Sequence, residues 1–269
     1  MASLPSHSFA RMDVDPDLQA QPLERDRVSL VIPTYREYAF GQSLDRLLAH
    51  LGGLPLLEFE ILVVDDSDAK TQAALNEEIA KRRRGLKRGM TLQLLSGPRR
   101  GKGAAVRLGV QRSTGSIVFI VDADLPVPLH NIEDFVEAMR MSGADAVVGE
   151  RPRNRYSDNT LRHVLSRGLW FIQRTLVFHG SAFEDTQCGF KSFRGGALRD
   201  IVDRQIVDRG MYDLEYLYAA MRRRLDVQRV AVDSSAEVRP SRINVWRCLL
   251  LDPFDIVRFK VFGVFGHYK

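Results

Sequence analysis

The sequence predicts an α/β protein with a mostly parallel sheet and helices on both of its faces. Along the first 150 residues, short apolar runs bounded by turn residues alternate with stretches whose apolar residues recur every three or four positions. A buried parallel strand has such a continuous run, and an amphipathic helix has such a spacing. With 45% hydrophobic residues among 269, the chain is also large enough to enclose a full core.

The predicted strands and helices follow one another in regular order. The apolar runs predict strands at residues 28–32, 59–64, 92–95, 117–121 and 146–148. The spacings between them predict helices at residues 39–51, 70–81, 103–112 and 129–141. Because strands joined by helices pair in parallel, this order predicts a doubly wound, Rossmann-like sheet. Ligands bind such a sheet beyond the carboxyl ends of its strands, so the residues that follow each strand are the candidates for chemistry.

The alternation ends after Gly149. The second half predicts helices at residues 159–178 and 210–223, a strand at 227–232 and a last amphipathic segment at 244–262. We expect three parts: a loose tail over residues 1–27, one catalytic domain over 28–243 and an amphipathic C-terminal segment over 244–269. We interpret the second half as an extension of the domain that the first half forms, and we expect it to recognise the acceptor.

Composition narrows the class of protein. The net charge of +5 suits an anionic partner such as a nucleotide diphosphate or a phospholipid surface, and it equally serves solubility. The arginines lack interleaved aromatic residues, so we expect no nucleic acid partner. Only Cys188 and Cys248 are present, which favours a reducing compartment. We find no secretory signal and no apolar run of the ~20 residues that span a bilayer, so we expect a cytoplasmic protein.

Two carboxylates follow the fourth predicted strand. Asp122 and Asp124 are two residues apart in "IVDADLP", and residues so spaced on a strand point to the same face. Both could therefore bind one cation that prefers oxygen ligands, Mg²⁺ or Mn²⁺, and such a cation would bridge a diphosphate. The alternative is a solvated turn after a strand, since short acidic pairs are common.

The other strand ends also carry polar motifs. They are "VIPTYRE" with Glu37, "VVDDSD" with Asp65 and Asp66, and "LSGPRRGKGAA" with Lys102. The last is not a Walker loop, because glycine follows the lysine where serine or threonine is required. Its glycines would let the backbone approach an anion at a helix N-terminus, or would simply make the turn into a helix.

Together these motifs, in this order, resemble glycosyltransferase family 2, which has the GT-A fold. The matching segments are "VIPTYRE", "VVDDSD" and "GKGAAVRLGVQRSTGSIVFIVDADLP", followed by "DTQCGFKSF" and "YDLEYLYAA". The segment "DTQCGFK" is the narrowest match and is similar to the dolichyl-phosphate glucosyltransferase and dolichyl-phosphate mannose synthase group. The resemblance runs from about Val28 to about Arg242.

The resemblance implies an enzyme that uses a nucleotide-sugar donor of the UDP-glucose or GDP-mannose type. It implies that Asp122 and Asp124 hold the metal on the diphosphate and that Lys102 lies near the nucleotide. The residues implied near the base and the ribose are Pro33, Tyr35, Glu37, Asp65 and Asp66. The chain departs from the family pattern at Arg36, often an asparagine, at "DDSD", which lacks the usual glycine, and at Pro126, which replaces a side chain that can help hold metal.

We expect the acceptor to be a phosphate. A sugar hydroxyl would need a general base, whereas a phosphate monoester with a second pKa near ~6 is already ionised and needs only arginine to orient it. The segment "GERPRNR" supplies Arg151, Arg153 and Arg155 after the fifth strand, and Arg167 follows; a solvated loop is the alternative. The resemblance adds Asp185, Gln187 and Arg242 near the acceptor. If Asp185 were a general base, the acceptor would be a hydroxyl.

The leading hypothesis is inverting, metal-dependent transfer of a hexose to a polyprenyl phosphate. Its rival is transfer to a soluble hydroxyl acceptor in polysaccharide or natural-product synthesis. Two other classes of enzyme fit the sequence less well. A haloacid-dehalogenase-type phosphatase would carry its aspartates on the first strand, whereas here they follow the fourth. A nucleotidyltransferase would have a glycine-rich loop after the first strand, and "PTYREY" has no glycine. The aromatic and basic residues of 244–262 suit a helix on the cytoplasmic surface of a membrane, although packing on the sheet is the commoner fate of an apolar face.

Overall fold

A computed structural model describes residues 26–37, 40–151, 175, 177–178, 185–186, 188–233 and 245–269, without the side chains of 245–250. The predicted tail therefore lies outside the described residues up to residue 25, as does nearly all of the helix predicted at 159–178. In the part of the chain that is described, every helix is too short or too polar to cross a membrane.

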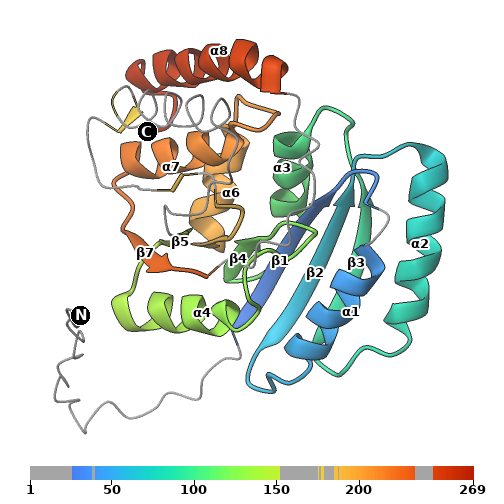
Figure 1. Ribbon diagram of the computed structural model, residues 1–269. Helices are drawn as coiled ribbons and strands as arrows, with labels where there is room; N and C mark the ends of the chain where they lie inside the picture. Colours follow the sequence, from blue (N-terminus) through green and yellow to red (C-terminus); the bar gives the residue numbers. More distant parts are fainter. Residues whose placement is uncertain are drawn as a thin grey trace, which may run out of the picture.

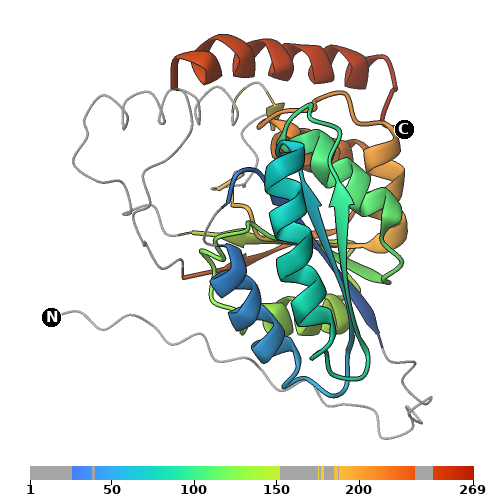
Figure 2. The ribbon, with the colours of Figure 1, turned by 90° about the vertical axis from the view of Figure 1, so that its right-hand side faces the viewer.

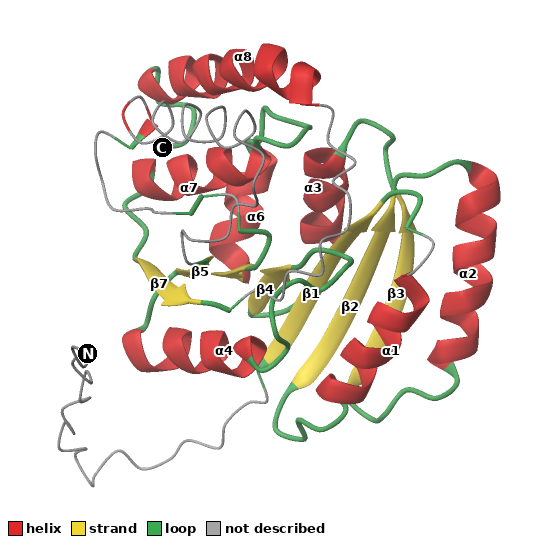
Figure 3. Ribbon diagram, in the orientation of Figure 1, coloured by secondary structure: helices red, strands yellow, loops and turns green. Residues whose placement is uncertain are grey.

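The first half has the predicted elements, and strands and helices alternate along it (Figures 1 and 3). They are β1 (Arg27–Thr34), α1 (Phe40–Leu51), β2 (Glu58–Asp65), α2 (Ala69–Arg83), β3 (Met90–Ser96), α3 (Lys102–Arg112), β4 (Ile117–Ile120), α4 (Asn131–Ser142) and β5 (Ala146–Glu150). Their described bounds agree with the sequence pattern to within a few residues, because apolar periodicity determines which segments are buried.

The second half contains two elements that the sequence pattern does not predict. They are β6 (Lys191–Arg194) and α6 (Gly195–Asp203); α7 (Tyr212–Arg222), β7 (Val227–Ala231) and α8 (Val245–Val264) are predicted. Strand β6 has only four residues and begins with a lysine, so it has no apolar run to indicate a strand.

The strands form one mostly parallel sheet in the order β3-β2-β1-β4-β6-β5-β7. Strand β1 pairs in parallel with β2 and β4, while β6 runs antiparallel to both β4 and β5. This confirms the doubly wound architecture. The chain changes direction of winding between β1 and β4, so their carboxyl ends form the crevice where ligands bind in folds of this kind.

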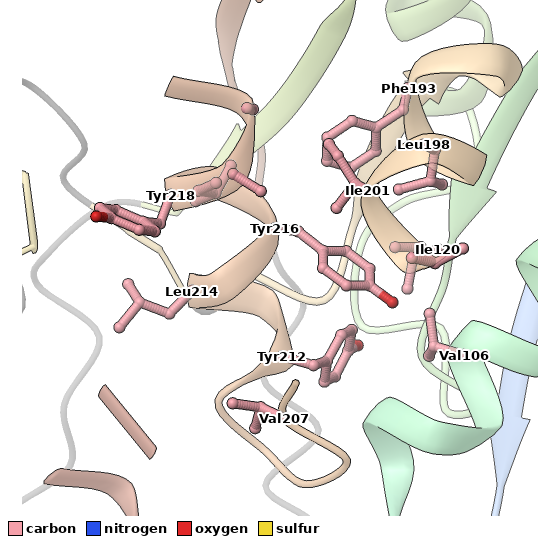
Figure 4. Close-up of a cluster of buried hydrophobic side chains, with 14 of the residues drawn as sticks. Val106, Ile120, Phe193, Leu198, Ile201, Val207, Tyr212, Leu214, Tyr216 and Tyr218 are labelled. Atoms are coloured by element: carbon pink, nitrogen blue, oxygen red, sulfur yellow. The ribbon is translucent and has the colours of Figure 1, made fainter. Parts of the chain in front are cut away.

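Two apolar cores hold helices on the two faces of the sheet. The first core packs α3, α6 and α7 on one face, and the second packs α1, α2 and α4 on the other. Figure 4 shows Ile120 of β4 beside Val106 of α3 and Tyr216 of α7, and Phe193 of β6 beside Ile201 of α6, in the first core. Helix α8 packs on α7, outside this layer (Figures 1 and 2).

Candidate active site

The loops after β1, β2, β3 and β4 meet at one edge of the sheet, which we call the catalytic edge. The register aligns Thr34 with Asp65 and Asp65 with Ser96, so the three neighbouring strands end at the same level. Three non-glycine residues in these loops have positive φ angles: Arg36 (51°), Arg99 (57°) and Leu125 (49°). Such conformations carry strain and gather where a site requires a fixed loop shape.

Asp65 and Asp66 both hold loops of the catalytic edge. Asp65 is buried and accepts hydrogen bonds from the Thr34 hydroxyl at 3.0 Å and the Ser67 hydroxyl at 2.8 Å. Asp66 accepts bonds from the backbone N–H groups of Arg99 at 2.5 Å and Gly101 at 3.1 Å. The two carboxylates therefore connect β1, β2 and the glycine-rich loop, a supporting role that the sequence does not reveal.

The glycines beside Lys102 allow the loop to pack closely on residues 207–212. A Cβ atom on Gly101 would lie 2.8 Å from the Asp208 carbonyl oxygen, and one on Gly103 would lie 2.7 Å from that of Val207. The Ala104 N–H donates to the Asp208 carbonyl at 3.0 Å. Of the two readings of this motif, the structure supports the turn into a helix directly, because both glycines meet protein backbone at this point.

Lys102, the first residue of α3, joins the glycine-rich loop to the acidic pair. Its Nζ lies 2.5 Å from Asp122 Oδ1 and 5.7 Å from the centre of the Tyr212 ring. Burial opposes the charge on Lys102, but Asp122, Asp213 and Asp124 outweigh it and raise its pKa to about 12. Lys102 is therefore a fixed cation at the place where a diphosphate would arrive.

Asp122 and Asp124 differ in their surroundings. Asp122 is half-buried, and Asp124 is exposed. A Cβ atom on Gly189 would fall only 1.9 Å from Asp122 Oδ2, so the backbone at Gly189 lies directly against this carboxylate. The segments that the sequence assigns to metal and acceptor, 67 residues apart, thus meet here.

The two aspartates fit a divalent cation in their chemistry. Both provide the hard oxygen atoms that Mg²⁺ and Mn²⁺ prefer. Among the described residues, no group of three or more His, Cys, Asp or Glu side chains gathers into a metal site.

A buried ion pair near Gly189 escapes sequence analysis. Lys191 is fully buried, and its Nζ donates to the Cys188 carbonyl at 2.5 Å and to Asp213 Oδ1 at 3.0 Å. The pair therefore fixes the residue next to Gly189 and connects it to the N-terminus of α7. Within the part of the chain that is described, the neighbouring Tyr212 hydroxyl has no hydrogen-bond partner, and burial raises the pKa of Tyr212 well above its ordinary value.

Arg151 and Asp185, two of the residues predicted to contact the acceptor, form an ion pair. Arg151 Nε donates to Asp185 Oδ2 at 2.5 Å, and a terminal nitrogen donates to Oδ1 at 3.1 Å. This is a two-point pair of a carboxylate and a guanidinium. The other residues predicted at the acceptor lie outside the described residues: Arg153, Arg155, Arg167, Gln187 and Arg242.

The remaining donor residues line the end of β1. Pro33 is buried in the strand, Glu37 is half-buried, and the Tyr35 ring is 55% exposed. The Arg36 guanidinium lies 5.3 Å from the centre of that ring. The Tyr35 ring is therefore accessible for stacking on a base, the role implied by the resemblance.

Comparison with known proteins identifies the family of the chain. Residues 29–206 match the model of the family described as glycosyl transferase family 2. The dolichyl-phosphate beta-glucosyltransferase of Dictyostelium discoideum is 28% identical over 262 residues, covering 92% of this chain and 78% of that protein. The enzyme of the same name from Saccharomyces cerevisiae is 28% identical over 260 residues, with 90% and 76% covered.

Solved structures share the fold at lower identity. Mycobacterium tuberculosis glucosyl-3-phosphoglycerate synthase, in complex with Mn²⁺ and UDP-glucose, superposes with a TM-score of 0.60 at 16% identity, covering 86% of this chain and 79% of that one. Mannosyl-3-phosphoglycerate synthase from Rubrobacter xylanophilus gives 0.58 at 16% identity, with 90% and 76% covered. The fold, the acidic pair beyond β4 and the match over residues 29–206 lead to one conclusion: the chain belongs to glycosyltransferase family 2 and is a hexose-transferring enzyme.

Proposed function

We propose that the protein transfers a hexose, with inversion, from a nucleotide-diphosphate sugar to a polyprenyl phosphate. The names of its curated relatives support this acceptor, and the Mn²⁺ and UDP-glucose complex of a structural neighbour supports this donor. The free, buried thiol of Cys188 agrees with work in the reducing cytoplasm, at the cytoplasmic face of a membrane.

The proposal depends on one contact, between the segment around Gly189, which we assign to the acceptor, and the acidic pair Asp122 and Asp124. Gly189 lies against Asp122, while Asp185, four residues earlier, is held by Arg151. An acceptor bound by the arginine would thus approach a sugar whose diphosphate is held at Asp122. Closeness and alignment of the two reactants are the main requirement of such a transfer.

On the donor side, we assign binding to the catalytic edge. Tyr35 would stack on the base, and Lys102 would face the diphosphate with its charge already fixed by Asp122. Asp122 and Asp124 would hold the divalent cation. When bound, that cation would neutralise the charge that develops on the departing nucleotide.

On the acceptor side, the chemistry needs orientation more than proton transfer. A phosphate monoester is largely ionised at neutral pH, and a guanidinium can bind two of its oxygens at once. Both oxygens of Asp185 already accept hydrogen bonds from Arg151, so Asp185 is better suited to positioning that arginine than to removing a proton. This favours the phosphate acceptor over the hydroxyl acceptor.

Product analysis tests the proposal. The purified chain would be incubated with UDP-glucose or GDP-mannose, with Mn²⁺ or Mg²⁺, and with a polyprenyl phosphate, the matching dephosphorylated polyprenol or phosphoglyceric acid. We expect a polyprenyl-phosphate hexose of inverted configuration from one donor, lost on chelation and weakened by Arg151→Ala. Transfer to the polyprenol or to phosphoglyceric acid, with none to the lipid phosphate, would refute the acceptor assignment.

A further inference from the structure

Helix α8 has an unusual distribution of side chains. Its described acidic residues, Asp252 and Asp255, are buried against the protein. Its exposed side instead carries a run of apolar residues with helical spacing. These are Phe254 (63% exposed), Val257 (56%), Val261 (47%), Phe262 (46%), Val264 (64%) and, just past the helix, Phe265 (85%). We call these six residues the apolar face; on a helix wholly in water the polarity of the two sides would be the reverse.

The helix cannot rotate to hide this face. A Cβ atom on Gly263 would lie 2.4 Å from Tyr218 Cε1, which shows how closely α8 approaches α7. The rings of Phe259 and Tyr218 lie 5.4 Å apart, and Asp255 Oδ1 accepts a bond from Arg209 at 3.0 Å. Tight packing, together with an ion pair whose carboxylate is buried, thus fixes which side faces outward.

Several described basic residues lie near the apolar face, one of them, Arg223, paired with Asp200. Arg258 is exposed beside it, and Lys269 is exposed at the C-terminus. At the same end of the molecule lies an open cavity of about 770 Å³ rich in arginine. Its lining residues are Met221, Arg222, Arg223, Arg224, Leu225 and Lys269. An apolar surface bordered by cations complements the interface of a bilayer that contains anionic lipid.

The position of α8 relates this face to the catalytic edge. Figures 1 and 2 show α8 beyond the end at which β1, β2 and β3 terminate. Arg209, the partner of Asp255, follows Asp208, whose carbonyl contacts the loop that carries Lys102. The helix therefore lies at the same end of the sheet as the catalytic edge.

We propose that the apolar face of α8 docks in the interface of an anionic lipid bilayer, with the helix parallel to the membrane plane. The inference deepens the proposed function, since a polyprenyl-phosphate acceptor resides in such a bilayer. A second copy of the chain is a poorer occupant, because a twofold contact of this face with itself would bring its bordering cations together. Docking would present the catalytic edge to the lipid phosphate.

Vesicle co-sedimentation tests the docking. The full chain would be mixed with vesicles of phosphatidylcholine, with or without 30 mol% (about one lipid in three) phosphatidylserine, to vary the surface charge. We expect the unchanged chain to bind the anionic vesicles. The triple variant Phe254→Ser/Val257→Ser/Val261→Ser should weaken this binding by at least about tenfold, and Arg258→Glu should weaken it by about tenfold. The matched controls are Leu56→Ser/Met141→Ser, which changes exposed apolar residues elsewhere (77% and 81% exposed), and Lys81→Glu in the basic run of α2.

Several outcomes would overturn the docking of α8 on a bilayer. Absence of vesicle binding by the unchanged chain, or equal loss in the control variants, would overturn the proposal. So would a dimer, measured by light scattering, that the α8 variant dissociates while vesicle binding persists. Asp124→Asn should leave vesicle binding unchanged, and the α8 variant should keep its thermal stabilisation by UDP with Mn²⁺. Failure of docking and failure of the proposed reaction are therefore separable.

Discussion

Asp122 is the residue at which the separate parts of the site meet. It accepts a charge-assisted bond from Lys102 at 2.5 Å and lies under Gly189, and its neighbour Asp124 is open to solvent. The positive charge of Lys102 balances the negative charge of Asp122 before any donor or cation binds. Substitutions of Asp122 and Asp124 therefore test the chemistry most directly.

Asp122→Ala and Asp124→Asn should each lower transfer by at least about a hundredfold, because each removes a carboxylate charge that would hold a divalent cation at the diphosphate. Initial rates across a Mn²⁺ titration measure the loss. Glu77→Gln, which alters an exposed carboxylate of α2, is the control and should keep full activity. Wild-type rates in both aspartate variants would end the assignment of these residues to the metal.

The buried pair of Lys191 and Asp213 should be important for stability. Lys191→Met leaves the Asp213 carboxylate without its partner in the interior, which costs about 3–5 kcal/mol of unfolding free energy. Urea denaturation followed by circular dichroism gives the number. Lys191→Met/Asp213→Leu should recover part of the loss, since no unpaired charge remains; a double variant less stable than the single one would contradict this account.

At the scale of elements, the sequence predicts the β-α alternation well because each segment repeats one periodicity over many residues. Strand β6 is missed because its burial depends on pairing with β4 and β5, not on its own composition. The pairs Lys102–Asp122 and Arg151–Asp185 are missed as contacts for a related reason. Their members come from different loops, 20 and 34 residues apart, and only the assembled sheet brings them together.

Gly189→Ala tests how closely the segment around Gly189 must lie on the acidic pair. The added methyl group would overlap the Asp122 carboxylate, 1.9 Å away, so we expect the segment to shift and transfer to fall about tenfold or more. Gly196→Ala in α6 is the matched control, since a Cβ atom there has nothing within 4 Å. The control should keep its activity and gain up to about 1 kcal/mol in stability, because alanine favours a helix. Equal activity in both variants would show that this contact tolerates displacement.

At the scale of the whole molecule, Glu215 of α7 connects distant parts of the chain. It is fully buried and accepts bonds from the Val207 N–H at 2.8 Å and the Tyr268 hydroxyl at 2.6 Å. Burial raises the pKa of Glu215 above its ordinary 4.5, against the effect of those bonds. The folded protein therefore holds this proton more tightly than the unfolded chain does.

This difference has a definite sign in stability. Below pH 4.5 the carboxyl is protonated in both states, and as the pH rises above 4.5 the unfolded chain releases the proton more readily, so unfolding becomes easier. The advantage in unfolding free energy of the unchanged chain over Glu215→Gln should therefore shrink as the pH rises from 4.5. Urea titrations of both proteins at several pH values measure it. An advantage that grows instead would show that the hydrogen bonds outweigh burial.

The direction of β6 has a consequence for how such enzymes diversify. The long excursion after β5 leaves the sheet at Glu150 and returns at Lys191, and because β6 is antiparallel to β5, both points lie at the same rim. The segment between these two points could therefore differ in length or sequence without any change in the order or direction of the strands. An exchange of this segment would leave the order of β1, β2, β3 and β4 unchanged.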